Sequence, residues 1–477
     1  MRTSLQQLKK IRQSDCMSFS RLVSIGSSLL LVSLHYFCFA AEAFTGINNQ
    51  IAFCTSSKIR AMTSINKKAR LSESSSNLMA SSSTENEIVK AAKDMNGRAK
   101  DVSPLTEDEL DMIVQSMKNI APEKNELHWN EIRQLLADVA HLSHKDWDRT
   151  GDSAAALRKL LLGQHDGGLL MPDFQKMFRR IMEEGNWYGA ASHASSYSEE
   201  QKPWVVLVTG VNGIRKTTSV YQPWFTQLLE EALVTPTGDE GKVTESVLPT
   251  GENSFFRQLD HMIISLTNVD FKRLYHLTSQ LVTDQDDIDK GIIQSYSDYK
   301  AAIFARFRTL SEILGVLLVR EANGQNLNVM IETSGRDIAM FHYVDKYFPS
   351  SDYNKLALHF FVDDLSHAES SVDQRMLREI RDGISALSSE DVQQIINANA
   401  GGPYGSEVLK GVQADSDRVW DQVVIGGEGG GVGKDWYKAS IRIDGHSTEP
   451  WTARAIKPDG SEGTLHKFIL PKHMQEK

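Results

Sequence analysis

Cysteine is scarce in this chain of 477 residues: there are three, Cys16, Cys38 and Cys54, all near the amino terminus. Residues 85–477 contain none, which excludes a disulfide framework, a cysteine-ligated metal centre and a cysteine nucleophile from that part of the chain. Positive charge is also in deficit, because 52 Lys and Arg face 62 Asp and Glu, for a net charge of −10. Nucleic-acid binding by bulk charge needs clustered basic residues, so we expect no nucleic-acid partner.

Long apolar runs are missing after residue 84. The one long apolar run, residues 22–41, lies in an amino-terminal leader segment. Residues 2–21 are basic, residues 22–41 are apolar, and Ala41-Glu42-Ala43 has the small-x-small form of a signal-peptidase site. This pattern predicts a secretory signal over residues 1–43. Because no later stretch is long and apolar enough to cross a bilayer, we expect a soluble mature chain without a membrane span.

The segment that follows this signal has a different composition. Residues 44–84 are rich in Ser and Thr and contain five basic residues but only one acid. A signal and a transit-like segment joined at Ala43-Phe44 resemble the bipartite plastid presequences of algae with secondary plastids. We therefore expect residues 1–84 to be a targeting presequence and the destination to be the plastid. The alternatives are a plain secretory signal with a linker, which directs the chain to the secretory pathway, and an uncleaved membrane anchor, since about 20 apolar residues can span a bilayer.

The rest of the chain divides into three regions by pattern. Residues 85–190 are predicted to be a helical domain, since Thr106-x-x-Glu109 has the form of a capping box and apolar residues recur at helical spacing. Those apolar stripes suit either a core or a protein partner. Residues 203–400 alternate strand-length apolar runs with helical patterns, which predicts a doubly wound parallel sheet. Residues 401–477 predict a small β-rich C-terminal subdomain, so the fold class is α/β.

The most informative segment follows the apolar run 204–208 and opens a helix. A phosphate loop needs glycines that let backbone N–H groups converge on an anion, a lysine for the phosphates and a hydroxyl for Mg²⁺. Lys216 and Thr217 stand at the spacing of G-x-x-x-x-G-K-[ST], although Arg215 replaces the last glycine. A non-glycine residue there adopts the loop conformation at some strain, or its side chain supplies a second cation. The candidate nucleotide-binding residues are Gly210, Asn212, Gly213, Arg215, Lys216, Thr217 and Thr218.

A second glycine-rich segment, Gly429–Lys434, looks similar but lacks the full pattern. Glu428 stands at the first glycine position and Asp435 replaces the hydroxyl residue. We interpret this segment as a hairpin, because glycine-x-glycine fragments alone are weak indicators of phosphate binding.

Charged residues follow the next two predicted strands. Glu332 ends the apolar run that begins at Asn328, at the edge where α/β sheets bind ligands. There Glu332 could orient Mg²⁺ or a water, and Arg336 could neutralise a transferred phosphate. Arg375 and Arg378 share one face of a later helix that could close over phosphates as a lid. The alternatives are that Glu332 is a helix N-cap acid, that Arg336 belongs to a surface ion pair, and that the helix face with the two later arginines is simply solvated.

The order of these segments resembles the zeta-toxin-like P-loop kinases over about residues 203–385. The matching segments are GVNGIRKTT, TGENSFFRQLD, IETSGRD and the strand and Arg-rich helix that follow. The resemblance implies a P-loop NTPase fold and an ATP-dependent phosphotransferase that acts on a small-molecule hydroxyl, with ATP and Mg²⁺ as cofactors. The acceptor is not identified by the resemblance.

The same resemblance implies roles for individual residues. Lys216 and Thr217 hold ATP and Mg²⁺, and an acid after the second strand deprotonates the acceptor. That acid falls near Glu252, with Asp260 as the alternative, and Arg375 or Arg378 takes the phosphate-holding lid role. Two departures from the family pattern bear on catalysis: the arginine before Lys216, and Gly-Glu-Asn where an aspartate is usual.

Two other interpretations stay open. The loop and the Glu-Thr-Ser-Gly-Arg turn also resemble the GTPases of the signal-recognition-particle type, but no Thr-Lys-x-Asp or Asn-Lys-x-Asp guanine-reading motif follows. In the third interpretation, Arg215 blocks the site and the chain is a non-catalytic P-loop scaffold that binds a protein through its helical domain.

Overall fold

The computed structural model describes part of the chain, all of it within one structural unit, Ser74–Lys477. The described residues are 87–121, 128–162, 172–196, 201–236, 251–282, 288–425 and 431–469. The predicted presequence, residues 1–84, lies outside them.

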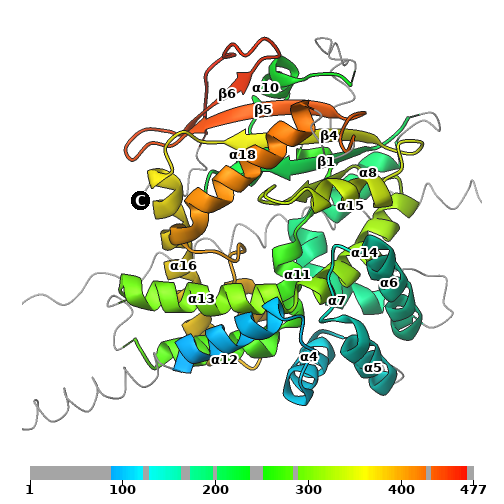
Figure 1. Ribbon diagram of the computed structural model, residues 1–477, viewed down its shortest axis with the longest axis vertical. Coiled ribbons are helices and arrows are strands. Elements are labelled where there is room, and N and C mark those ends of the chain that lie inside the picture. Colours follow the sequence, from blue (N-terminus) through cyan, green and yellow to red (C-terminus); the bar gives the residue numbers. More distant parts are fainter. Residues whose placement is uncertain are drawn as a thin grey trace, which may run out of the picture. The chain divides into compact units, whose positions relative to one another are not determined.

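A seven-stranded sheet runs through this unit in the order β2-β3-β1-β4-β5-β6-β7 (Figure 1). Its strands are β1 (Trp204–Thr209), β2 (Phe255–Arg257), β3 (Val329–Glu332), β4 (Asn354–Phe361), β5 (Tyr437–Asp444), β6 (Thr452–Ile456) and β7 (His466–Lys467). The strands from β2 to β5 in this order pair in parallel, whereas β6 and β7 pair antiparallel. The fold is therefore α/β with a mixed sheet, and the predicted parallel pairing applies to its first five strands.

Strand β1 lies inside this sheet, between β3 and β4, and is buried on both faces. Its six residues are all apolar except Thr209, and all are buried, as expected for a parallel strand covered by helices on either side. Val206 and Val208 pack into one core and Val205 and Leu207 into the other, because successive side chains of a strand point to opposite faces. Strand β1 therefore contributes side chains to both cores.

Helices account for most of the described residues. The helices before the sheet are α4 (Glu107–Ile120), α5 (Trp129–Val139), α6 (Trp147–Leu162), α7 (Pro172–Glu184) and α8 (Trp187–Ala194). Those between β1 and β3 are α9 (Lys216–Val220), α10 (Phe225–Ala232), α11 (Leu259–Leu266), α12 (Asn268–Ser279), α13 (Lys290–Arg306) and α14 (Arg308–Gly324), with a 3₁₀ turn at Gly251–Asn253. Those after β3 are α15 (Ala339–Tyr347), α16 (Ser366–Ala386), α17 (Val392–Ala398) and α18 (Leu409–Ile425), with a 3₁₀ turn at Ser406–Val408. Within the described ranges, no helix has the length and apolarity needed to cross a bilayer.

The amino-terminal helices share a core with the helices that connect the strands. Ile113, Met117, Ile132 and Leu136 are fully buried and belong to the same cluster as the apolar side chains of α11 to α14. Helix α4 packs on α11 and α12, and α6 packs on α14. The region predicted as a separate helical domain is thus part of the wall of the α/β unit, and its apolar stripes are covered by the chain itself.

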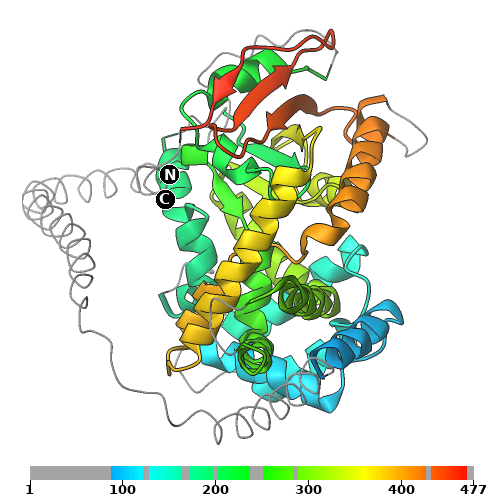
Figure 2. The same ribbon diagram turned by 90° about the vertical axis from the view of Figure 1, so that its left-hand side faces the viewer.

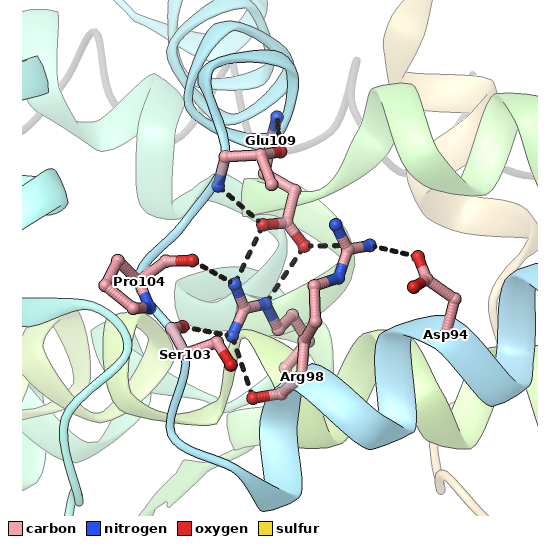
Figure 3. Close-up of polar contacts among 7 residues, drawn as sticks. Asp94, Arg98, Ser103, Pro104 and Glu109 are labelled. Carbon is pink, nitrogen blue, oxygen red and sulfur yellow. Dashed lines mark hydrogen bonds and ion pairs between the residues drawn. The ribbon is translucent and has the colours of Figure 1, made fainter.

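One buried arginine joins these two sets of helices. Arg306, at the end of α13, donates hydrogen bonds to both carboxylate oxygens of Glu109 at 2.9 and 2.8 Å and to the carbonyls of Arg98, Ser103 and Pro104 (Figure 3). Burial raises the pKa of Glu109, but these contacts have the larger effect and hold that pKa below its usual value. The predicted capping box is also present, since the Glu109 N–H donates to the Thr106 hydroxyl and the Thr106 N–H donates to the Glu109 carboxylate.

The carboxyl-terminal strands are not arranged as a separate subdomain. Strand β5 pairs with β4 over six residues, so β5 to β7 extend the central sheet. Residues 409–425, which the sequence pattern assigns to a β-rich region, form helix α18, which packs against β4. Helix α16 runs from the sheet to α12 and α13 and so connects the two layers (yellow in Figure 2).

Candidate functional site

The loop between β1 and α9 has the backbone of an anion-binding nest. Gly210, Gly213 and Arg215 have positive φ angles of 125°, 88° and 60°, and among the described residues Ile214 is not one of those with positive φ. Left-handed and right-handed residues in alternation turn successive N–H groups toward one point, which creates a concave site for an anion. Helix α9 begins directly after this loop, at Lys216.

Two of these glycines are required by close packing as well as by φ. A Cβ atom on Gly210 would lie 2.1 Å from the carbonyl oxygen of Phe360, and one on Gly213 would lie 2.6 Å from that of Ala368. Distances this short exclude any side chain. The loop is therefore fixed between β4 and the first turn of α16.

Arg215 adopts the conformation that a glycine would have at this position. Its φ of 60° and ψ of 32° are left-handed, which costs a non-glycine residue on the order of 1 kcal/mol. Its guanidinium lies over the ring of Trp451, 4.4 Å from the ring centroid, and burial lowers its pKa. The side chain is not among the residues that line the cavity next to the loop, which is described below. Only the backbone of Arg215 therefore belongs to the loop site.

Lys216, Thr217 and Glu332 come together at the ends of two adjacent parallel strands. The Lys216 ammonium donates to the carbonyls of Gly210 and Val211, both at 2.8 Å, and lies 3.1 Å from Glu332 Oε1. The Thr217 hydroxyl donates to Glu332 Oε2 at 2.6 Å. Glu332 ends β3 opposite Val208 of β1, so sheet register places its carboxylate beside the loop, as the sequence pattern predicts.

A cavity of about 690 Å³ opens beside this group. It lies at the carboxyl edge of β1, β2 and β3, where the chain order of the sheet reverses around β1, and such switch points are where α/β folds bind ligands. Asn212, Thr217, Glu332 and Arg336 line its near side. Thr218 is exposed on α9 and does not line it.

The two acids predicted as alternative bases lie at opposite edges of the sheet. Glu252 is exposed in the turn before β2, and the next residue, Asn253, accepts a hydrogen bond from Asn328, which precedes β3. Because β2 and β3 are parallel, this is the amino edge, away from the loop. Asp260, at the start of α11, lines the cavity and accepts a hydrogen bond from the Gly402 N–H at 2.8 Å. The structure thus places Asp260 in the site and Glu252 outside it.

The predicted arginines also separate. Arg375 lines the cavity, and its buried Nε and Nη2 atoms have no hydrogen-bond partner among the described residues; burial lowers its pKa. Arg336 lies over the ring of Tyr404, 4.8 Å from the centroid, at the rim. Arg378, one turn beyond Arg375, is exposed and does not line the cavity.

The far side of the cavity contains a cluster that the sequence analysis does not identify. Arg257, at the end of β2, and Arg308, at the start of α14, both bind the fully buried carboxylate of Glu312. Burial raises the pKa of Glu312, but the two guanidinium groups have the larger effect and lower that pKa to about 2. His144, from the loop before α6, also lines this end, and burial together with Arg308 lowers its pKa to about 4. The sequence signals available are a strand-terminal arginine in FFR and an i, i+4 Arg–Glu pair in α14, and neither indicates that α14, β2 and the loop with His144 meet.

Comparison of the chain with protein-family models, with curated proteins and with solved structures gives no match. In the part of the chain that the structure describes, no group of three or more His, Cys, Asp and Glu side chains is placed to hold a metal ion. The features that bear on function are therefore the geometry of the loop, the carboxylate of Glu332 and the cavity.

Proposed function

We propose that this protein is a P-loop phosphotransferase that moves a phosphoryl group from ATP, with Mg²⁺, to a hydroxyl of a small molecule. The observation that carries the proposal is the meeting of Lys216, Thr217 and Glu332 at the loop, with the Thr217 hydroxyl 2.6 Å from the Glu332 carboxylate. A hydroxyl after the loop lysine and an acid at the end of a core strand are the groups that hold Mg²⁺ in P-loop NTPases.

The donor atoms present fit Mg²⁺ and triphosphate. Magnesium prefers hard oxygen ligands and retains several waters, so one hydroxyl and one carboxylate suffice to position it. When bound, the ion neutralises charge on the phosphates. The loop N–H groups and the Lys216 ammonium provide the fixed positive field that phosphoryl transfer needs, since such catalysis is mostly positioning and electrostatic stabilisation.

Asp260 takes the role of general base in this proposal. It faces the cavity from α11, and the Gly402 N–H fixes its Oδ2 atom. As the acceptor oxygen forms its bond to the terminal phosphorus and the bond to ADP breaks, Asp260 accepts the hydroxyl proton. Arg375, whose Nε and Nη2 atoms have no hydrogen-bond partner in the described ranges, stabilises charge on the transferred group.

Two features support a catalytic protein over a scaffold. The Arg215 guanidinium lies against Trp451 and leaves the cavity open. The apolar stripes of the amino-terminal helices, which a scaffold would offer to a partner, are buried in the protein's own core.

The test is nucleotide binding by the full chain, and the readout is its thermal unfolding with ATP or GTP, each with and without Mg²⁺. ATP with Mg²⁺ at about a hundred times its dissociation constant should stabilise the protein by about 2.7 kcal/mol, and Lys216→Ala should reduce this stabilisation to about 0.4 kcal/mol. Lys434→Ala is the matched control, because this exposed lysine ends the similar glycine-rich segment at the amino edge of the sheet. A shift with GTP alone would favour the GTPase, and no shift with either nucleotide would favour the scaffold.

We also propose that residues 1–84 direct the chain to the plastid, on the composition and the Ala43-Phe44 junction alone. A fluorescent protein fused to these residues should accumulate in the plastid of an alga with a secondary plastid. Accumulation in the secretory pathway would support the alternative signal.

A further inference from the structure

The far end of the cavity carries positive charge that the described residues do not neutralise. Arg257 and Arg308 share the single carboxylate of Glu312, so this cluster has a net charge of one positive unit. Arg257 is 1% exposed, and its Nε atom has no hydrogen-bond partner among the described residues. An uncompensated charge in a partly desolvated site is costly unless an anion arrives to share it.

Arg308 presents its remaining donors to the cavity. Its Nε and Nη2 atoms both donate to one oxygen, Glu312 Oε1, at 3.1 and 2.8 Å, and its side chain stays 30% exposed. Arg306, two residues earlier, is the contrast: five acceptors saturate it and 1% of its side chain is exposed. Both arginines line the cavity, but of the two only Arg308 keeps guanidinium hydrogens without an acceptor among the described residues.

The surrounding contacts hold this end in place. Thr309 donates to the carbonyl of Leu142 at 2.5 Å, and Lys145 forms an ion pair with Asp337 after β3. These contacts fix the loop that contains His144. The low pKa of His144 keeps its ring neutral near pH 7, so the ring supplies one donor and one acceptor without adding charge.

We propose that this far end is an anion-binding subsite for the acceptor, and that the acceptor carries a phosphate or carboxylate group in addition to the hydroxyl that receives the phosphoryl group. Arg257 ends β2, which is two strands from β1 across β3, and at about 4.8 Å per strand the subsite is roughly 10 Å from the loop. A sugar phosphate or a hydroxy acid spans such a distance, with its hydroxyl near Asp260. This inference rests on the proposed function for the identity of the acceptor, but the anion site itself is testable alone.

The test is binding of inorganic phosphate to the full chain, measured by ³¹P NMR or calorimetry at constant ionic strength. It is carried out in the Lys216→Ala background, which weakens phosphate binding at the loop. Adding Arg308→Gln should weaken the remaining phosphate binding by at least about tenfold, because a charge-assisted, forked donor is lost. Arg308→Lys should weaken it less, since it retains the charge but not the fork. Arg418→Gln, on an exposed arginine paired with Asp415, is the matched control and should have no effect.

Two further arms keep the outcome clear. Acetate in place of phosphate distinguishes the two anions: tighter phosphate binding identifies a phosphorylated acceptor, and tighter acetate binding identifies a hydroxy acid. His144→Phe tests the same site by a substitution outside the Glu312 cluster and should reduce binding severalfold. Equal phosphate binding with and without Arg308→Gln, or no binding of either anion in the Lys216→Ala protein, would overturn the proposal. Circular dichroism of each variant shows that it is folded.

Failure of this inference is separable from failure of the proposed function. ATP binding should depend on Lys216 and change less than about twofold in Arg308→Gln, because Arg308 is roughly two strand spacings from the loop. Phosphate binding that depends on Arg308 in a protein that does not bind ATP would leave the anion site standing and refute the phosphotransferase. ATP binding without an Arg308-dependent anion site would leave the phosphotransferase standing and refute the anion-binding subsite.

Discussion

Two Lys–Glu pairs in this protein have the same chemistry and different surroundings. Lys300 and Glu379, on α13 and α16, are both 0% exposed, and Glu379 also accepts hydrogen bonds from the Tyr296 hydroxyl and the Ala400 N–H. Lys216 and Glu332 lie at the loop, where the lysine side chain is 2% exposed but the glutamate is 28% exposed to the cavity. The first pair is closed to ligands and the second is open to them.

The difference indicates what each pair does. The Lys300 pair fixes the residues around Gly401, since the Lys300 ammonium also donates to the Gly401 carbonyl at 3.3 Å, and this segment lines the cavity. The Lys216 pair has a carboxylate that can exchange one partner for another, because solvent reaches it. A buried ion pair with every position satisfied is a structural device, whereas one that faces a cavity suits the exchange of ligands.

The largest expected effect is on the closed pair. Glu379→Gln should destabilise the protein by about 3–5 kcal/mol, because it leaves the Lys300 ammonium buried without a counter-ion. Urea-induced unfolding measures this change. The double variant Lys300→Met with Glu379→Leu should recover most of the loss, since neither position then carries a buried charge. A change below about 1 kcal/mol in Glu379→Gln would show that the two pairs do not differ in the way described.

The next effect is on the open pair and appears in binding rather than in stability. Lys216→Ala should weaken ATP binding about 100-fold, or roughly 2.7 kcal/mol, because the charge-assisted contacts of the ammonium are lost. Its free energy of unfolding should change by about 1 kcal/mol or less, since water can solvate Glu332. Calorimetric titration and urea unfolding of the same samples separate these quantities. A large loss of stability with unchanged ATP binding would show that the Lys216–Glu332 pair is structural and does not bind the nucleotide.

A pH titration sharpens the comparison, because the open cavity contains a histidine with a low pKa. The pKa of His144 is about 4 in the folded state, against an ordinary value of 6.5. Between these values the unfolded chain binds the proton and the folded protein does not, so stability falls as pH is lowered from 6.5 toward 4. The wild-type protein should lose about 1–2 kcal/mol more than His144→Phe over this interval. Parallel unfolding curves for the two proteins across these pH values would contradict this expectation.

The smallest effect concerns the residue that shapes the loop of the open pair. Arg215→Gly relieves a left-handed non-glycine conformation and loses the contact with Trp451, and these terms are each about 1 kcal/mol with opposite sign. We expect a net change in stability below about 1 kcal/mol and unchanged ATP binding. Loss of ATP binding in this variant would show that the Arg215 side chain acts on the nucleotide.

The sequence alone predicts the open pair better than the closed one. Lys216 and Thr217 occur in a contiguous motif, and Glu332 ends an apolar run of strand length, so local pattern places all three. Lys300 and Glu379 lie 79 residues apart, and nothing in their neighbourhoods signals that they meet. The Arg257–Glu312–Arg308 cluster was missed for the same reason, since α14 reaches β2 only through tertiary packing.

Two local errors have physical causes. Strand β2 is three residues long, too short for a period to be visible, and it is stabilised by pairing with β3 rather than by its own sequence. The expectation that the base falls near Glu252 needs a strand that ends before that residue, whereas β2 at Phe255–Arg257 sends Asp260 to the carboxyl edge and leaves Glu252 at the amino edge. Helix α18 was missed because its apolar side chains are interrupted by Gly411 and several acids.

The bond between Arg306 and Glu109 joins residues that are 197 positions apart. Ribosomes add about 5–20 residues per second, so the amino-terminal helices exist for roughly 10–40 s before the arginine that fastens them is made. For most of that interval the apolar side chains of α4 lack α11 and α12, and those of α5 lack α14, which cover them in the finished protein. Newly made chains should therefore depend on chaperones that shield exposed apolar helices, and shortened chains that end before α13 should aggregate.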